Sequence, residues 1–170
     1  LIESDYPSDK IITVLCTEER AGDSAQQTAR RIKSRFGDAF RRFFVTIHPA
    51  DIAGEVKGKG ANITYAAKQV VPALLKDGFR PDDILVTTID ADNRVDRQYF
   101  SSLTKVFLDS PDPKHTSYQP LPMYFNNIWD VPMFIRMVAL GSSFWVMVEA
   151  TRPYRLRNFS AHSQSLTGLI

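Results

Sequence analysis

Residues 83–93 read DILVTTIDADN, and this stretch decides which fold we expect. Its apolar, β-branched run over residues 84–89 is typical of a strand that is buried along its length. The run ends in two carboxylates, Asp90 and Asp92. Open α/β sheets bind ligands at the carboxyl ends of their strands, and paired carboxylates there suit a hard divalent cation. The same spacing also fits a strand followed by an Asp cap and a solvated turn.

Strand and helix patterns alternate on both sides of this stretch. We expect strands over residues 10–17, 41–48 and 84–89, and helices over residues 25–36, 61–76 and 95–108. Three such alternations predict a largely parallel sheet with helices on its faces.

The rhythm changes after residue 109, where prolines become frequent. We expect a short strand over residues 116–121, an apolar helix over 131–148 and an alternating strand over 154–165. The apolar helix reaches the lower limit of a membrane span, but a central Arg136 is costly in hydrocarbon. A buried or interface-lying helix is therefore expected. Trp129 and Trp145 fit interfacial anchoring and core packing about equally well.

The composition is that of an ordinary globular domain: 170 residues, 44% hydrophobic and 24% charged. A formal net charge of +2 gives no reason to expect a nucleic-acid partner. The basic residues crowded into residues 30–42 are interpreted as one solvated helix face.

The single cysteine, Cys16, excludes an internal disulfide, fits a reducing compartment and is expected to be a small buried residue. No signal peptide is visible, the chain opens on Leu1, and both ends look cut, so we expect a piece of a longer protein.

Chemically useful residues follow the expected strands. Gly58 and Gly60 allow close approach to a ligand at a helix start, which favours negative charge. His48 is expected to be a hydrogen-bonded strand-end residue. The candidates at strand and helix ends are Glu18, Glu19, Lys59, Asn62, Asp90 and Asp92. Because strand carboxyl ends meet at one edge of a parallel sheet, we expect these residues to converge.

The ordered set of segments resembles the family 2 glycosyltransferases over nearly the whole chain. Glu18-Glu19 followed by Asp23 is similar to the family's acidic strand end. Gly58-Lys59-Gly60-Ala61-Asn62 is similar to a shortened G-K-x-x-A-x-N segment. Asp90-Ala91-Asp92, followed by Tyr99-Phe100, resembles the family's DADT passage. Gln119-Pro120 and then Asn126 or Asn127 resemble the Q-P segment of processive, membrane-associated members.

The resemblance implies a GT-A fold: a Rossmann-like, three-layer α/β/α arrangement with a mostly parallel mixed sheet. Residues 1–170 would be an incomplete catalytic domain. Within it, residues 1–109 would form the nucleotide-sugar-binding half and residues 110–170 the start of the acceptor-binding half. The protein would lie in the cytoplasm at the inner face of a membrane, attached through regions outside this chain.

The implied reaction is metal-dependent, inverting transfer of a sugar from a nucleotide-sugar, with a UDP-sugar favoured, to a hydroxyl of a carbohydrate or lipid acceptor. Glu18 and Glu19 would contact the nucleoside, although the family more often has Asp there. Lys59 and Asn62 would flank base and ribose or the first phosphate. Asp90 and Asp92 would hold Mg²⁺ or Mn²⁺ on the diphosphate. The acceptor-side candidates are Gln119, Asn126 and His162.

The chain departs from the family in two places. The family's opening strand is missing, and its acidic general base would lie beyond Ile170. No catalytic base is therefore assigned. Two rival interpretations stay open: a haloacid-dehalogenase-like phosphatase, in which Asp90 would be the nucleophile, and a non-catalytic nucleotide-sugar-binding module.

Overall fold

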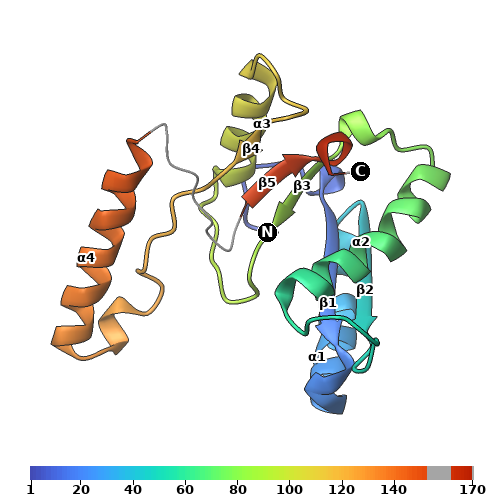
Figure 1. The fold of residues 1–170 in the computed structure, drawn as a ribbon, viewed down its shortest axis with the longest axis horizontal. Coiled ribbons are helices and arrows are strands. Elements are labelled where there is room, and N and C mark those ends of the chain that lie inside the picture. The colour runs from blue at the N-terminus through green and yellow to red at the C-terminus, as the bar shows by residue number, and fades with distance from the viewer. Residues whose placement is uncertain (153–161, 170) are drawn as a thin grey trace. The chain divides into compact units, whose positions relative to one another are not determined.

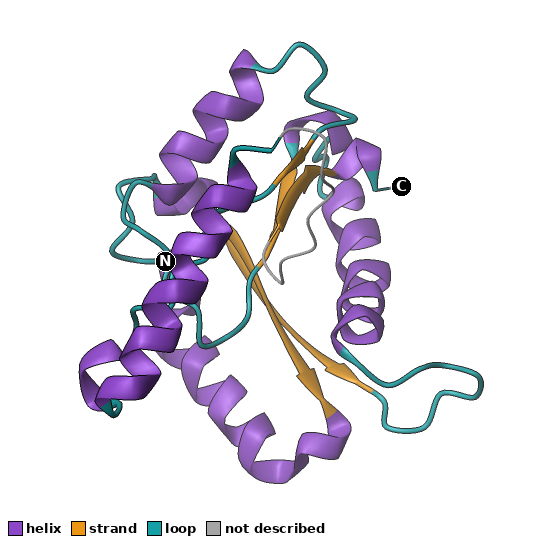
Figure 2. Cartoon of the chain, turned by 60° about the vertical axis from the view of Figure 1, so that its left-hand side comes forward, coloured by secondary structure: helices purple, strands orange, loops and turns teal. Residues whose placement is uncertain are grey.

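The computed structural model describes residues 1–152 and 162–169, and its architecture is mixed α/β (Figures 1 and 2). The chain divides into two compact units. Unit 1 comprises Leu1–Arg80 and Arg97–Ser101, and unit 2 comprises Pro81–Asp96 and Ser102–Ile170. The expected division at residue 109 into a donor half and an acceptor half concerns function and stays a prediction.

Unit 1 is built on two parallel strands. Strand β1 (Ile12–Glu18) pairs with β2 (Arg42–His48) in a register that runs from Ile12↔Arg42 to Glu18↔His48. Helices α1 (Gly22–Phe36) and α2 (Lys59–Lys76) complete the unit, and both pack against the strands. The two strand ends at Glu18 and His48 therefore lie side by side, as the sequence predicts.

Helix α2 forms because apolar residues recur at helical spacing. Ala66, Val70 and Leu74 lie four residues apart and are buried on one face of the helix. Helix α1 contributes the buried Ala29, whereas the basic residues of α1 are exposed. The expected solvation of the basic residues is thus confirmed, but they do not share one helix face, because Arg41 lies after α1 and Arg42 opens β2.

The returning segment of unit 1 is held by the N-terminus. The backbone N–H of Asp5 donates to the carbonyl of Arg97 at 2.8 Å, and the Asp5 carboxylate forms an ion pair with the Arg97 guanidinium at 2.8 Å. These contacts explain why Arg97–Ser101 packs with unit 1 although the chain has already passed through part of unit 2.

Unit 2 contains an antiparallel sheet of three short strands in the order β3-β5-β4. Strand β5 (His162–Ser165) lies in the middle and pairs with β3 (Leu85–Thr88) and β4 (Ser117–Tyr118). The register runs from Leu85↔Ser165 to Thr88↔His162, and Tyr118 lies opposite Ser163. Helices α3 (Tyr99–Asp109) and α4 (Met133–Ala150) follow β3 and β4 in the chain.

Six 3₁₀ helices connect the elements in the described residues: η1 (Ser8–Lys10), η2 (Glu19–Ala21), η3 (Gly37–Ala39), η4 (Pro81–Asp83), η5 (Ile128–Asp130) and η6 (Leu166–Gly168). In unit 2, hydrogen bonds connect η4 and η6 at the end of the sheet where β3 begins and β5 ends. The backbone N–H of Leu166 donates to the carbonyl of Ile84 at 2.9 Å, and the Thr167 hydroxyl donates to the Asp82 carboxylate at 2.6 Å.

The described structure confirms most expected elements and corrects their connection. Strands β1 and β2 are parallel, but β3 has no hydrogen-bonded neighbour from that pair in residues 1–152 and 162–169; its partner is the antiparallel β5. The expectation of one mostly parallel sheet through all three strands is therefore not met. The expectation failed because a hydrophobic run indicates that a segment is a strand but not which other strand it will pair with. The expected strand over residues 154–165 is seen from His162 onward, and residues 154–161 lie outside the described part.

One helix of the described residues, α4, is long and apolar enough to span a membrane, with a mean hydropathy of 1.4. Only 17% of it is buried, so the expectation of a helix buried in the core is wrong and the interface-lying alternative stays open.

Candidate functional site

Asp90 and Asp92 lie in the turn after β3, which ends at Thr88. Asp90 lies two residues beyond the strand and is half-buried, whereas Asp92 is exposed in the turn that follows. The backbone N–H of Asn93 donates to the Asp90 carbonyl at 3.0 Å, which closes this turn. The turn thus presents one carboxylate to solvent and keeps the other against the unit.

Strand β5 brings His162 to the same end of the sheet. His162 lies opposite Thr88, and its Nδ1 is 3.0 Å from the Thr88 hydroxyl oxygen. One position further along, the hydroxyls of Thr87 and Ser163 are 2.8 Å apart, and Ser163 is fully buried. These paired side chains hold the imidazole beside the last residue of β3.

The acceptor-side candidates Gln119 and Asn126 belong to the same region of unit 2. Gln119 directly follows β4, whose Tyr118 lies opposite Ser163, so Gln119 leaves the sheet at the end where β5 begins. The side-chain amide of Asn126 donates to the backbone carbonyl of Asp92 at 3.1 Å. Unit 2 therefore gathers five of the expected site residues at one end of one sheet: Asp90, Asp92, Gln119, Asn126 and His162.

This constellation could hold a cation only with help from a ligand. Within residues 1–152 and 162–169, no group of three or more His, Cys, Asp or Glu side chains is arranged to bind a metal ion. Asp90 and Asp92 offer carboxylate oxygens, the donors that Mg²⁺ and Mn²⁺ prefer, and Mg²⁺ commonly completes its shell with water and substrate phosphates. The residues present fit a metal that binds together with a phosphorylated ligand.

Unit 1 contributes a second cluster, at the ends of β1 and β2. The Glu18 carboxylate forms an ion pair with Arg20, and the Glu19 carboxylate accepts the backbone N–H of Ala50 at 2.9 Å. The hydrogen bond from the Arg20 guanidinium lowers the pKa of Glu18 below the ordinary glutamate value. His48 Nε2 is 3.0 Å from the Glu55 carboxylate, as expected for a hydrogen-bonded strand-end residue.

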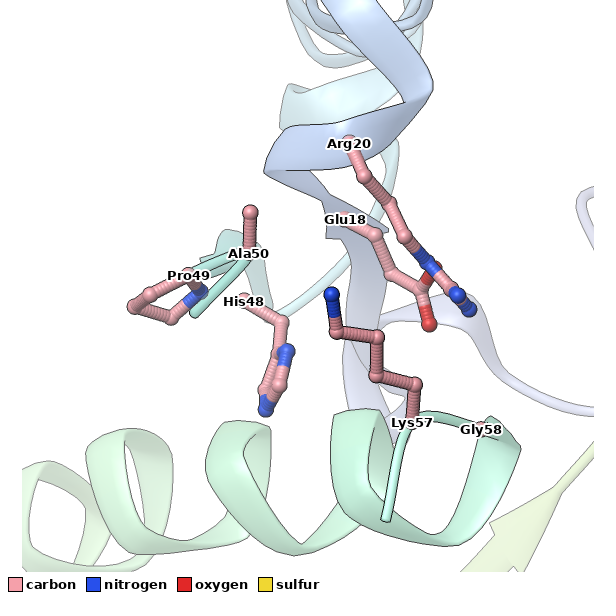
Figure 3. Close-up of a pocket in the computed structure, with 7 residues that line it drawn as sticks. All are labelled: Glu18, Arg20, His48, Pro49, Ala50, Lys57 and Gly58. Carbon is pink, nitrogen blue, oxygen red and sulfur yellow. The ribbon is translucent and has the colours of Figure 1, made fainter. Parts of the chain in front are cut away.

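A small cavity lies within this cluster (Figure 3). It is lined by Glu18, Arg20, His48, Pro49, Ala50, Lys57 and Gly58, and its volume is about 10 Å³. Figure 3 shows Lys57 pointing from the loop before α2 into the space between His48 and Glu18. A volume of this size holds roughly one water molecule, so a nucleoside does not fit it as it stands.

Lys59 and Asn62, the candidates at the start of α2, do not line this cavity. Lys59 is exposed at the first position of the helix, and Asn62 is half-buried one turn later. The Asn62 side-chain oxygen is buried and has no hydrogen-bond partner in the described part of the chain. A buried acceptor of this kind is costly to leave unpaired, which makes it a plausible contact for a ligand donor.

A larger, open depression in unit 1 was not predicted from the sequence. It has a volume of about 530 Å³ and lies between the loop after β2 and one face of α2; its lining residues are Ile52, Ala53, Gly54, Glu55, Val56, Ala61, Thr64, Tyr65 and Lys68. Ala61, Thr64, Tyr65 and Lys68 recur at helical spacing, and this is the signal by which the face could have been found.

Cys16 is not a candidate nucleophile. Burial raises the pKa of its thiol above the ordinary value, and a hydrogen bond with Thr46 acts in the opposite direction with the smaller effect. A raised pKa reduces the thiolate fraction at neutral pH. The side chain is half-buried rather than fully buried as the sequence predicts.

No family model, curated protein or solved structure matches this chain. The functional interpretation therefore depends on the motifs and on the geometry of the two clusters.

Proposed function

We propose that this chain is part of the catalytic domain of a metal-dependent, inverting glycosyltransferase with a GT-A fold. It would use a nucleotide-sugar, with a UDP-sugar favoured, and an acceptor hydroxyl, in polysaccharide or glycolipid synthesis at the cytoplasmic face of a membrane. The observation that carries this proposal is the grouping of Asp90, Asp92, Gln119, Asn126 and His162 at one end of the sheet of unit 2.

Unit 2 would bind the diphosphate and the sugar. Asp92 is exposed, and the Asn126 amide donates to its backbone carbonyl. This hydrogen bond holds the backbone of Asp92 in place and does not involve its carboxylate. When bound by Asp90 and Asp92, Mg²⁺ or Mn²⁺ would neutralise charge on the departing nucleoside diphosphate. Asp90, which is half-buried beside β3, would also approach the sugar.

Unit 1 would bind the nucleoside. Glu18 and Glu19 supply hydrogen-bond acceptors, Lys59 supplies a positive charge at the start of a helix, and the unpaired Asn62 oxygen can accept from a base or ribose.

The transfer would break the bond between the anomeric carbon and the diphosphate oxygen and form a bond to the acceptor oxygen. The acceptor hydroxyl gives its proton to a base, which must lie within hydrogen-bond reach. His162, Gln119 and Asn126 would position the acceptor. We assign no residue of this chain as that base, and we expect the chain to bind donor but to turn it over poorly.

The binding step can be tested by calorimetry of UDP with and without Mn²⁺. We expect Mn²⁺ to strengthen UDP binding to the parent protein, and Asp92→Asn to weaken the Mn²⁺-dependent binding by roughly tenfold or more, since one charged metal ligand is lost. Asp130→Asn, which removes another exposed carboxylate of unit 2, is the matched control and should bind as the parent does. Equal UDP affinity of Asp92→Asn and the parent, with Mn²⁺ present, contradicts the assigned role.

Turnover separates the proposed transferase from the two rival interpretations. Release of nucleoside diphosphate from UDP-glucose, UDP-N-acetylglucosamine and GDP-mannose should be measured for this chain and for a chain extended at both ends, with membrane extract as acceptor. Acceptor-dependent release by the longer chain alone supports the proposal. Rapid release by the 170-residue chain shows that the base is already present. Tight binding without release by either chain identifies a binding module, and hydrolysis of a phosphomonoester that Asp90→Asn abolishes identifies a phosphatase.

A further inference from the structure

Thr88 and His162 lie opposite each other at the end of the sheet of unit 2 where β3 ends and β5 begins (Figure 1). Directly opposite residues of an antiparallel pair point to the same side of the sheet, so the hydroxyl and the imidazole meet across the two strands. The Thr88 hydroxyl oxygen is 3.0 Å from His162 Nδ1 and 3.4 Å from the His162 backbone carbonyl oxygen. One hydroxyl therefore contacts two atoms of the same histidine.

The protons available to these atoms decide which imidazole nitrogen carries hydrogen. A threonine hydroxyl has one proton to donate and two lone pairs with which to accept. The His162 carbonyl oxygen can only accept, so the Thr88 hydroxyl donates its proton to that oxygen. The hydroxyl oxygen then has only lone pairs to offer to Nδ1, and the 3.0 Å contact is a hydrogen bond when Nδ1 carries the proton. In the neutral ring, Nε2 is then left with its lone pair.

The opposite tautomer satisfies the same atoms less well. With hydrogen on Nε2, the Thr88 hydroxyl would donate to Nδ1, and its oxygen would face the His162 carbonyl oxygen with no proton between them. Strand pairing fixes both residues, so the two oxygens stay close in either tautomer. Hydrogen on Nδ1 gives two hydrogen bonds at this place, whereas hydrogen on Nε2 gives one.

The register that makes this contact is fixed on the other side of the sheet. There the hydroxyls of Thr87 and Ser163 are 2.8 Å apart, and Ser163 is fully buried with Tyr118 opposite it. A slip of one residue would turn every one of these side chains to the wrong side of the sheet. The imidazole of His162 is therefore positioned by the strand register as well as by its own hydrogen bond.

His162 lies on the more open side of this sheet. Side chains alternate along a strand, and the buried Ser163 and Ser165 mark the covered side. His162 and Gln164 belong to the other side and are half-buried. Within residues 1–152 and 162–169, the imidazole hydrogen bond of His162 uses Nδ1, and none uses Nε2. Nε2 is thus a hydrogen-bond acceptor on the side of the sheet where a ligand can bind.

An imidazole nitrogen without a proton selects among the groups of a nucleotide-sugar and its acceptor. Phosphate oxygens are themselves acceptors, so they form no hydrogen bond with such a nitrogen. A carbohydrate hydroxyl has a proton to donate. Mg²⁺ and Mn²⁺ prefer carboxylate, carbonyl and water oxygens to imidazole, and Asp90 and Asp92 supply carboxylates nearby in the chain. The chemistry of Nε2 therefore favours a hydroxyl of a carbohydrate.

We propose that Thr88 is a positioning residue that holds His162 in the tautomer with hydrogen on Nδ1, so that Nε2 accepts a hydrogen bond from a hydroxyl of a bound carbohydrate. The ligand part of this inference rests on the proposed function, because it specifies how His162 would contact its sugar. The tautomer does not rest on it, because it follows from the contacts of Thr88 alone. His162 receives a hydrogen bond in this role and is not assigned as the base of the transfer.

Nitrogen-15 NMR of the imidazole rings tests the tautomer in the chain without any ligand. The chain has three histidines, His48, His115 and His162, so replacing each in turn by glutamine assigns every signal. At alkaline pH, where imidazole is neutral, a nitrogen that carries hydrogen and one that does not resonate far apart. We expect His162 to show hydrogen on Nδ1 and none on Nε2. Hydrogen on Nε2 in the parent protein overturns the proposal.

Two replacements of Thr88 show whether its hydroxyl sets the tautomer. Thr88→Val keeps the β-branched shape and removes the hydroxyl, so we expect the proton to move to Nε2, the nitrogen that carries it in most free histidine. Thr88→Ser keeps the hydroxyl and should keep the proton on Nδ1. An unchanged tautomer in a folded Thr88→Val overturns the positioning role. If Thr88→Val does not fold, as judged by circular dichroism, the comparison of Thr88→Ser with the parent and the parent's own signals decide.

Adding a sugar to the same samples tests the ligand. With UDP and Mg²⁺ present, we expect glucose, N-acetylglucosamine or mannose at high concentration to shift the Nε2 signal of His162. The signals of the exposed His115 should stay in place and serve as the control. An unshifted Nε2 signal with all three sugars overturns the ligand assignment, and a shift with Mg²⁺ alone identifies a metal ligand instead and overturns it too. Calorimetry of UDP with Mn²⁺ tests the proposed function separately, so its failure is distinguishable from failure of this inference.

Discussion

Glu18 and Arg20 lie two positions apart at the end of β1, and their ion pair governs how this carboxyl titrates. We predict that Arg20→Ala raises the pKa of Glu18 toward the ordinary glutamate value, because the carboxylate loses its donor and the neighbouring positive charge. Carbon-detected NMR titration of the glutamate carboxyls measures this. Arg35→Ala, which removes an exposed arginine from α1, should leave the Glu18 titration unchanged.

The direction of the shift decides where the ion pair contributes to stability. Since the pKa of Glu18 is lowered in the folded protein, the contribution is present above the unfolded-state pKa and is lost as the pH falls through the folded-state pKa. The pair is solvent-exposed, so the change in the free energy of unfolding should be small. A Glu18 titration midpoint that does not move in Arg20→Ala contradicts the assignment.

Among the described glycines, Gly168 has the closest backbone neighbour to the position that a Cβ would occupy. A Cβ at this position would overlap the backbone carbonyl oxygen of Lys114, which cannot withdraw as a flexible side chain could. We predict that Gly168→Ala lowers the free energy of unfolding by roughly 1–3 kcal/mol. Gly141→Ala is the control: nothing lies within 4 Å of its Cβ position, and it is inside a helix, so this change should stabilise by about 0.5–1 kcal/mol. Equal effects of the two changes in urea unfolding would rule out the close approach at Gly168.

At the scale of elements, α2 offers two adjacent leucines in opposite environments. Leu74 is 5% exposed and Leu75 is 41% exposed. We predict that Leu74→Ala lowers the free energy of unfolding by about 2–5 kcal/mol, because a cavity opens against the strands of unit 1. Leu75→Ala should cost less than about 1 kcal/mol. Chemical denaturation of both variants measures the difference, and a larger loss for Leu75→Ala would mean that α2 is rotated from the orientation described.

The elements show what the sequence could predict and where it failed. Strands β1, β2 and β3 and helices α1 to α4 were expected close to their observed positions, because hydrophobic spacing is a local property. The pairing of β3 was not predictable, because its partner β5 reads HSQS and carries no apolar signal. Side-chain contacts such as Thr87 with Ser163 accompany this pairing, and only the folded chain reveals them.

The same limit applies to the candidate site. Asp90 and Asp92 were found because they follow an apolar run, and His162 because it lies in an alternating polar segment. The contact of the Asn126 amide with the backbone of Asp92 was missed, since no sequence pattern reports which backbone a distant amide will meet. Arg20 and Lys57, which line the small cavity of unit 1, were given no role from the sequence, because single charged side chains are common and usually solvated.

At the scale of the whole molecule, the two compact units should unfold separately. Each has its own strands and its own buried residues. We predict two transitions in differential scanning calorimetry, with Leu74→Ala lowering the temperature of only one and Gly168→Ala only that of the other. A single transition that both variants shift equally would show that the units unfold as one.

The central position of β5 has a consequence for how the chain acquires its structure during synthesis. Both neighbours in the sheet, β3 and β4, precede it, and 74 positions separate Thr88 from its partner His162. At about 5–20 residues per second, the ribosome needs roughly 4–15 s to make that intervening stretch. Throughout this interval β3 has emerged but has no strand to pair with, and its unpaired edge is open to other chains. Unit 2 should therefore depend on chaperones, or on rapid translation of the stretch between β3 and β5, in a way that the β1–β2 pair, complete by His48, does not.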